Sequence, residues 1–231
     1  MTDVQDDDLT SEPTQDGPKV TAEETAARRA NVLNAFLDLV PEMGWTAQTL
    51  DAAAQKCELD AMDAWALFPK KEQDVLATWS RVLDFDMQEK LKTLDLETMK
   101  IRERIFWAVR TRLNLLEPRK EAASRAMRFL LCPTNTRLTL PLLYDTVHLM
   151  WVMAGDTATD YNFYTKRFLL SGVYVSTFLY WLKDTSPEHH KSWSFLEKRI
   201  ENVLALQKLK SWTTGGERSF TELFKFFWPF S

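Results

Sequence analysis

A run of residues without charge, from Phe168 to Leu182, constrains the fold of this 231-residue chain more than any other feature. Lys166 and Arg167 precede the run, and Lys183 and Asp184 follow it. The run is shorter than the ~20 apolar residues that a membrane-spanning helix needs. A helix that is apolar on nearly all sides without crossing a bilayer lies either in a soluble core or along an apolar cavity.

The residues before this run predict a tight polar corner between two helices. Gly155 accommodates the left-handed conformation that ends a helix. Four side chains after it can accept hydrogen bonds from the free N–H groups of the next helix: Asp156, Thr157, Thr159 and Asp160. Residues 151–184 therefore predict a helix end, a corner and a long apolar helix.

Composition and periodicity predict an all-α protein. Hydrophobic residues make up 45% of the chain and charged residues 27%, and the six glycines are too few for a β-rich fold. Apolar positions at helical spacing, interrupted by prolines, predict nine or ten helices in one domain over residues 22–212. The expected helices cover residues 22–39, two short stretches capped by Thr46 and Asp60, 72–91, 98–116, 119–131, 135–154, 160–183 and 186–212. Residues 1–21 are acidic and broken by proline, and we expect a disordered tail there.

Residues 22–70 resemble the helix-turn-helix domain of tetracycline-repressor-type regulators, with residues 71–212 as the ligand-binding part. Glu58 stands where such a turn usually has glycine. The helix after Asp60 offers no Arg, Lys, Asn or Gln to a base edge, and residues 46–68 carry one basic residue, Lys56, against four acids. Because DNA binding needs cations that neutralise phosphates, we expect no nucleic-acid partner. A regulator that senses a hydrophobic ligand is the alternative, and DNA binding at low salt would distinguish it.

The motifs of catalysis are missing. No glycines have the spacing that cradles phosphate, and there is no Gly-x-Ser-x-Gly elbow. Asp145 and His148 supply only one of the two carboxylate-x-x-His pairs that a di-iron bundle needs. The sequence therefore predicts a protein that is not an enzyme and that has no metal and no cofactor.

The last residues predict a membrane-binding segment. Thr213 to Gly216 are typical of a flexible hinge, and residues 217–231 are rich in aromatic side chains flanked by basic ones. Such a segment suits the bilayer interface, with these side chains inserted: Phe220, Leu223, Phe224, Phe227 and Trp228. Packing of the segment on the protein's own core, or on a second copy, remains open.

A motif around the corner resembles one family. It runs through Trp151, Ala154-Gly155-Asp156, Thr159-Asp160, Asn162, Tyr164 to Arg167, Leu170 and Val173-Tyr174, followed by Asp184-x-Ser186 and Trp193-x-Phe195-Leu196. It is similar to the lipid-binding accessory protein of ubiquinone biosynthesis, which has a tetracycline-repressor-like fold. The resemblance implies a non-enzymatic homodimer that holds isoprenoid lipid and presents it to the membrane-associated hydroxylase acting on demethoxyubiquinone. It maps the surface for this partner to Asp160, Asn162, Phe163, Tyr164, Lys166 and Arg167.

Together these observations predict a lipid site along the uncharged helix, holding an isoprenoid lipid or a phospholipid. We expect its walls to be Phe168, Leu169, Val173, Tyr174, Phe178 and Trp181, with Leu149 and Trp151 from the preceding helix. In a bacterium the protein would be cytoplasmic and peripheral on the inner membrane, and in a eukaryote it would lie on the matrix face of the mitochondrial membrane. A scaffold without ligand is a third possibility, which an absence of co-purified lipid would favour.

Overall fold

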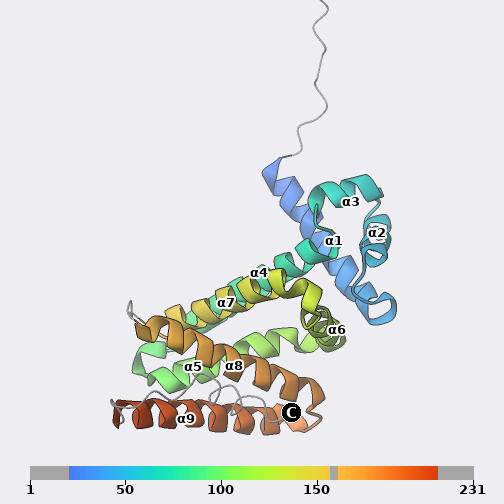
Figure 1. Ribbon diagram of the computed structural model, residues 1–231. Helices are drawn as coiled ribbons and strands as arrows, with labels where there is room; N and C mark the ends of the chain where they lie inside the picture. Colours follow the sequence, from blue (N-terminus) through green and yellow to red (C-terminus); the bar gives the residue numbers. More distant parts are fainter. Residues whose placement is uncertain (1–20, 157–160, 213–231) are drawn as a thin grey trace, which may run out of the picture.

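The computed structural model describes residues 21–156 and 161–212, with the backbone alone for 161–162 and 204–212 (Figure 1). The predicted tail before Thr21 and the predicted membrane segment after Trp212 lie outside the described residues. All regular structure in the described ranges is helical, which confirms the all-α prediction. The helices are α1 (Ala22–Met43), α2 (Ala47–Lys56), α3 (Ala61–Leu67), α4 (Glu72–Lys92), α5 (Ile101–Leu116), α6 (Lys120–Leu130), α7 (Thr136–Met153), α8 (Tyr161–Lys183) and α9 (His190–Trp212).

Helices α1, α2 and α3 form the helix-turn-helix part, and local hydrogen bonds set their ends. The Thr46 hydroxyl accepts from the N–H of Thr49 at 3.2 Å, and the Asp60 carboxylate accepts from the N–H of Asp63 at 2.7 Å. Glu58, between α2 and α3, has a φ of 58°, the left-handed value that normally favours glycine. The turn therefore keeps its shape although glycine is absent.

Three predicted helix boundaries were wrong. The helix expected from residue 98 begins at Ile101, after a separate 3-10 turn at Leu96–Thr98. The first helix continues through Pro41 to Met43, because a proline near a helix end removes only its own N–H bond, and Gly44 then ends the helix with a φ of 78°. The last helix begins at His190 instead of Ser186. Glu188 and His189 both have positive φ, so residues 187–189 form a separate 3-10 turn.

The remaining helices form a body of three layers (Figure 1). Helices α4 and α7 lie side by side over α5 and α8, α9 lies beneath these two, and α6 packs between α1 and α7. Aromatic rings join the helix-turn-helix part to this body: Trp45 stacks on Trp79 of α4 with ring centroids 5.8 Å apart, and it meets Phe36 of α1 edge to face at 5.1 Å. The Trp45 indole also donates to the Glu72 carbonyl at 3.0 Å. Within the described ranges, no helix has the length and apolarity to cross a membrane.

Candidate functional site

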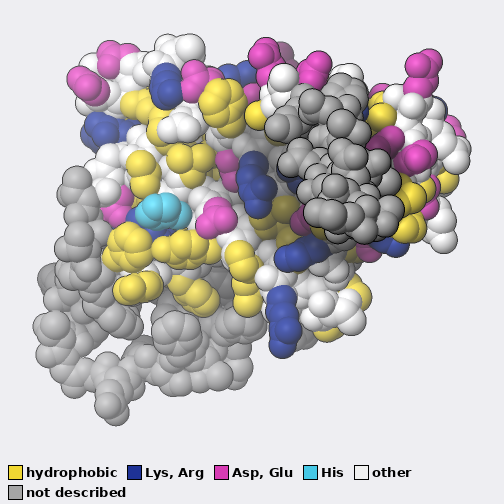
Figure 2. Space-filling model, turned by 90° about the horizontal axis from the view of Figure 1, so that it is seen from above, with side chains coloured by type: hydrophobic (Ala, Val, Ile, Leu, Met, Phe, Trp, Pro, Cys, Tyr) yellow, Lys and Arg dark blue, Asp and Glu magenta, His cyan; other side chains and the backbone are white. Residues whose placement is uncertain are grey.

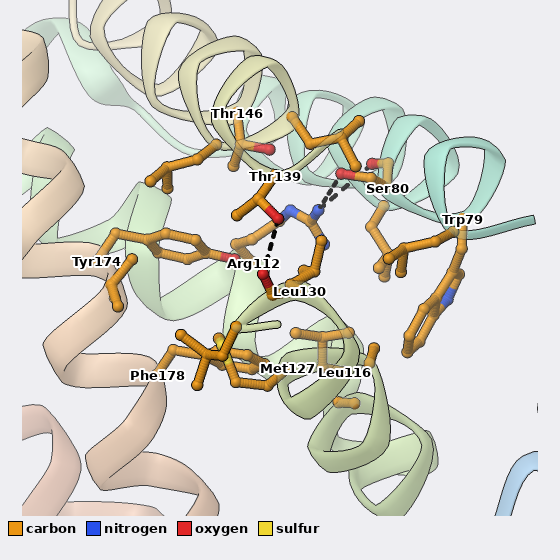
Figure 3. A pocket seen from close by; sticks show the side chains of 18 residues that line it. Trp79, Ser80, Arg112, Leu116, Met127, Leu130, Thr139, Thr146, Tyr174 and Phe178 are labelled. Atoms are coloured by element: carbon orange, nitrogen blue, oxygen red, sulfur yellow. Dashed lines mark hydrogen bonds between the residues drawn. The ribbon is translucent and has the colours of Figure 1, made fainter. Parts of the chain in front are cut away.

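An apolar pocket of about 130 Å³ lies between α4, α5, α6, α7 and α8 (Figure 3). Its walls come from every one of these helices, so the pocket exists only in the folded body. The lining residues are Leu76, Trp79, Ser80, Leu83, Arg112, Leu116, Ala123, Ala126, Met127, Leu130, Leu131, Thr139, Leu142, Leu143, Thr146, Tyr174, Val175 and Phe178. A site of this kind, mostly apolar with a few convergent polar groups, is typical of a small-molecule or lipid site.

A buried charge pair lies against one wall of the pocket. Nε of Arg112 donates to the Asp84 carboxylate at 2.9 Å, and the Arg112 side chain is only 5% exposed. The Thr146 hydroxyl donates to the same carboxylate at 3.0 Å. Nη2 of Arg112 donates to the Ser80 carbonyl at 3.3 Å, as Figure 3 shows. Burial raises the pKa of Asp84, although Arg112 and Thr146 act in the opposite direction. Burial also raises the pKa of the Tyr174 phenol, which lines the same pocket.

The structure places two of the eight predicted lipid-binding residues, Tyr174 and Phe178, in the pocket wall. Leu169, Val173 and Trp181 are buried in the core, away from the pocket, and Phe168 is 40% exposed. The reason is geometric: successive residues of a helix point about 100° apart, so only one stripe of an apolar helix can face a given pocket. Leu149 and Trp151 are half-buried on α7 and do not line the pocket either. Contact between any of the eight and a lipid stays a prediction.

Most of the pocket wall was not predicted, because its residues on α4, α5, α6 and α7 have the pattern of an ordinary core. One signal was present. Arg112 occupies the apolar stripe of its helix, at helical spacing from Ile105, Val109 and Leu116, where a charged residue needs a partner. That position could have indicated a buried polar site.

The corner between α7 and α8 is held by charges that were predicted to face a partner. Asp156 binds Lys166 through Oδ1 at 2.7 Å and Arg167 through Oδ2 at 3.2 Å. Arg167 also donates from Nε to Nδ1 of His148 at 3.0 Å, and its side chain is 4% exposed. Arg167 is therefore part of the interior in this structure, a correction to its prediction as a partner-facing residue, because a buried arginine must satisfy its donors inside the protein.

Gly155 is fixed by its surroundings. Its φ is 81°, and a Cβ at this position would meet Nη1 of Arg104 at 2.9 Å. That nitrogen donates to the carbonyl of Ala154, at the end of α7, at 3.1 Å. The absence of a side chain at Gly155 leaves room for Arg104, which caps the end of α7. The sequence predicted that the helix ends at Gly155, but it did not identify Arg104 as the cap.

Of the remaining predicted partner residues, Tyr164 is the most exposed of those described, at 68%. Its ring contacts Phe163 edge to face, with centroids 5.1 Å apart. Lys166 is partly exposed, at 28%. Asp160 lies outside the described residues, as does the side chain of Asn162.

Further apolar side chains are exposed on α7 and α8. They are Leu140, Tyr144 and Val152 of α7 and Phe168 of α8, each at least 40% exposed. The α7 positions are spaced by four and eight residues, so they share one side of the helix. Figure 2 shows hydrophobic side chains gathered on part of the face that carries α4 and α7. Such a gathering favours contact with a protein or a membrane.

Comparison with known proteins places these features in one family. The COQ9 family model matches residues 136–207. The chain is 34% identical over 180 residues to the mitochondrial ubiquinone biosynthesis protein COQ9 of Rattus norvegicus, covering 75% of this chain and 57% of the relative. It is also 34% identical over 181 residues to the Homo sapiens protein of the same name, with 75% and 56% covered. The chain belongs to the COQ9 family.

The part matched by the COQ9 model contains α7, α8, the charged corner and one wall of the pocket. Asp84 and Arg112 lie before the matched residues. The chain spans a little over half the length of the curated COQ9 relatives named above.

A solved structure supports the fold. The TetR transcriptional regulator from Nitrosomonas europaea ATCC 19718 superposes with a TM-score of 0.63 at 14% identity, covering 77% of this chain and 98% of the regulator. This COQ9-family chain therefore has the tetracycline-repressor-like fold that its helix-turn-helix pattern predicted.

Proposed function

We propose that this chain is a non-enzymatic lipid-binding protein of ubiquinone biosynthesis. It holds an isoprenoid lipid in the pocket between α4 and α8 and presents it to the membrane-associated hydroxylase that acts on demethoxyubiquinone. The observation that carries the proposal is the apolar pocket, in a chain whose relatives are named as ubiquinone biosynthesis proteins. An apolar pocket in a soluble body shields from water a ligand that would otherwise stay in the bilayer.

The size of the pocket bears on how the lipid is held. A cavity of about 150 Å³ is known to accept one benzene ring, and this pocket has about 130 Å³. The pocket as formed accommodates a ring or a short chain segment. The rest of an isoprenoid tail would run along the exposed apolar side chains or be covered by a second copy of the chain, since we propose a homodimer.

The docking surface for the hydroxylase in this proposal centres on Tyr164 and Phe163, beside the buried corner. An exposed aromatic side chain on a rigid support is the kind of anchor that dominates protein interfaces. The corner below it supplies the rigidity through Asp156 and Arg167. The exposed apolar positions on α7 extend the same surface. Membrane contact through residues 217–231, and a location on the inner face of the membrane or the mitochondrial matrix face, complete the proposal.

The charge of α3 does not favour a regulator of transcription. The helix that would enter the major groove exposes Met62 and Trp65, and Asp60 and Asp63 lie at its first turn. Acids at this place repel phosphates, and neither exposed side chain makes bidentate contacts to base edges.

Native mass spectrometry of the gently purified full chain, followed by lipid extraction, tests the proposal. We expect a bound isoprenoid species that copurifies and that is transferred to liposomes when these are added. Preparations without any bound lipid, together with no uptake from isoprenoid-containing liposomes, would contradict it.

A further inference from the structure

Two polar groups at the pocket wall have no hydrogen-bond partner among the described residues. Nη1 of Arg112 is buried and unpaired, although Nε and Nη2 of the same guanidinium are satisfied by Asp84 and Ser80. No hydrogen bond of the Tyr174 hydroxyl occurs within the described part of the chain, and this side chain is 91% buried. An unpaired buried donor costs about 1–3 kcal/mol, so Nη1 of Arg112, with the unbonded Tyr174 hydroxyl in the same pocket, points to a ligand that accepts from both.

Both side chains line the same pocket. Figure 3 shows the hydroxyl end of the Tyr174 ring directed toward Arg112, with both side chains among those that line the pocket. They come from α8 and α5, which pack against each other. Apart from these groups, the hydroxyls of Ser80, Thr139 and Thr146 and the indole N–H of Trp79, the side chains of the lining are apolar. The hydroxyls of Thr139 and Thr146 are already bonded, to the Leu130 carbonyl and to Asp84.

The charges of the pocket are already balanced. Arg112 is paired with Asp84 at 2.9 Å, so an anionic head group would add a second negative charge beside that carboxylate. Burying an uncompensated charge is far more costly than burying a neutral polar group that receives hydrogen bonds. A phosphate or carboxylate ligand is therefore disfavoured, and a neutral oxygen acceptor is favoured.

We propose that Arg112 and Tyr174 form a subsite for a neutral carbonyl or ether oxygen on a ring-sized head group. The ligand oxygen accepts hydrogen bonds from Nη1 of Arg112 and from the Tyr174 hydroxyl, while the apolar wall packs on the ring. The subsite selects neutral oxygen-bearing rings over acids and over plain hydrocarbons. This inference rests on the proposed function, because it specifies which end of the lipid enters the pocket.

Ring-sized probes test the subsite without the solubility problems of a long tail. Acetophenone and ethylbenzene differ only by a carbonyl oxygen in place of two hydrogens, and benzoate adds a negative charge. Their dissociation constants with the full chain can be measured by ligand-observed NMR titration. We expect acetophenone to bind at least as tightly as ethylbenzene, although its carbonyl costs more to remove from water, and benzoate to bind at least about tenfold more weakly.

Two conservative variants then separate the subsite from general packing. Tyr174→Phe removes only the hydroxyl, and Arg112→Lys keeps the charge opposite Asp84 while removing the spare donor. Each should weaken acetophenone about three- to tenfold, the range expected for one lost hydrogen bond, and change ethylbenzene less than about twofold. Tyr180→Phe, on the exposed side of α8, is the matched control and should change neither constant. The infrared carbonyl stretch of bound acetophenone should move to higher frequency in Tyr174→Phe.

The results that would contradict the subsite differ from those that would contradict the proposed function. If both rings bind and the two variants weaken them equally, the subsite is wrong while the pocket remains a ligand site. Benzoate binding more tightly than acetophenone would equally overturn the subsite. If neither ring binds and no lipid copurifies with the full chain, the proposed function fails as well. Should Arg112→Lys unfold, Tyr174→Phe alone decides, because the hydroxyl that it removes makes no hydrogen bond to the residues that the structure describes.

Discussion

Nη1 of Arg167 lies 3.2 Å from Oδ2 of Asp156, and each of these side chains is less than 5% exposed. The pair joins the residues that follow α7 to the first turns of α8. His148 extends the contact by accepting from Nε of Arg167 at 3.0 Å. This buried network explains why acidic and basic residues surround a helix that is otherwise free of charge: they close its N-terminal end onto α7.

Removing the arginine should destabilise the corner strongly. Breaking a buried ion pair typically costs about 3–5 kcal/mol, because the remaining charge stays buried. We expect Arg167→Met to lower the free energy of unfolding by about 3 kcal/mol, at the lower end because Lys166 still pairs with Asp156. Lys166→Met is the matched control and should cost less than about 1 kcal/mol, because its side chain is partly exposed. Urea denaturation measures the free energy of unfolding of both variants. Equal losses for Arg167→Met and Lys166→Met would contradict the view that Arg167 makes the stronger, buried ion pair.

The exposed aromatic beside this corner should act on binding and not on folding. Tyr164 is 68% exposed, so Tyr164→Ala should change the free energy of unfolding by less than about 0.5 kcal/mol. If it is the anchor of a docking surface, its loss should weaken binding to the hydroxylase by about 2 kcal/mol, or roughly thirtyfold. Surface plasmon resonance with the purified hydroxylase measures this.

A second exposed aromatic provides the comparison. Phe85 on α4 is 60% exposed, and Phe85→Ala should leave hydroxylase binding unchanged. Equal weakening by both variants would mean that Tyr164 is not a specific anchor. Loss of copurified lipid in Tyr164→Ala would mean that the residue supports the fold of the lipid site instead of the partner surface.

Local features of the fold were predictable from the sequence, and the pocket was not. Thr46, Asp60 and Gly155 act through hydrogen bonds or backbone angles within a few residues, so their sequence context is enough to predict a cap or a helix end. The Arg112–Asp84 pair joins residues 28 positions apart, and nothing local specifies which acid an arginine will meet. The uncharged run of α8 predicted burial correctly, but its periodicity could not say which stripe faces the core and which faces the pocket.

The sequence also could not show whether the charged residues next to the apolar helix face solvent, a partner or the interior. Lys166 and Arg167 are adjacent, and either could face solvent or a partner. In the structure they diverge: Lys166 reaches Asp156 from the surface, with its ammonium 5.5 Å from the centre of the Trp151 ring, whereas Arg167 lies in the interior over Phe163. Successive helical residues point about 100° apart, so adjacent charges seldom share an environment.

Filling the pocket should remove lipid without unfolding the protein. Ala126 lines the pocket from α6 and is 5% exposed. Ala126→Leu places a larger side chain into existing space, so we expect a change in stability of less than about 1.5 kcal/mol, because overpacking costs arise only where no space exists. Copurified lipid, measured by extraction and mass spectrometry, should fall at least about threefold. Ala66→Leu on the exposed side of α3 should keep its lipid, and retention of lipid by Ala126→Leu would place the ligand elsewhere.

The junction between α8 and α9 should give stability a dependence on acid pH. Asp184 accepts four hydrogen bonds, from the N–H and hydroxyl of Ser186 at 2.8 and 2.6 Å and from those of Ser192 at 2.8 and 2.6 Å. Burial raises the pKa of the carboxyl, but these bonds outweigh it and hold the pKa of Asp184 well below its usual value. Replacing it by Asn at neutral pH should therefore lower the free energy of unfolding by about 2 kcal/mol.

The sign of the pH effect follows from the lowered pKa of Asp184. The unfolded carboxyl takes up its proton near pH ~3.9, whereas the folded one stays ionised to lower pH, so its contribution is complete above about pH 4 and falls as the pH drops further. The stability difference between the wild type and Asp184→Asn should thus be constant from pH 7 to 5 and shrink below pH 4. The raised pKa of Asp84 acts in the opposite direction, but it is common to both proteins and cancels in the difference. Asp95→Asn, at an exposed position, should show no such change, and a difference that grew on acidification would contradict the role of the four hydrogen bonds.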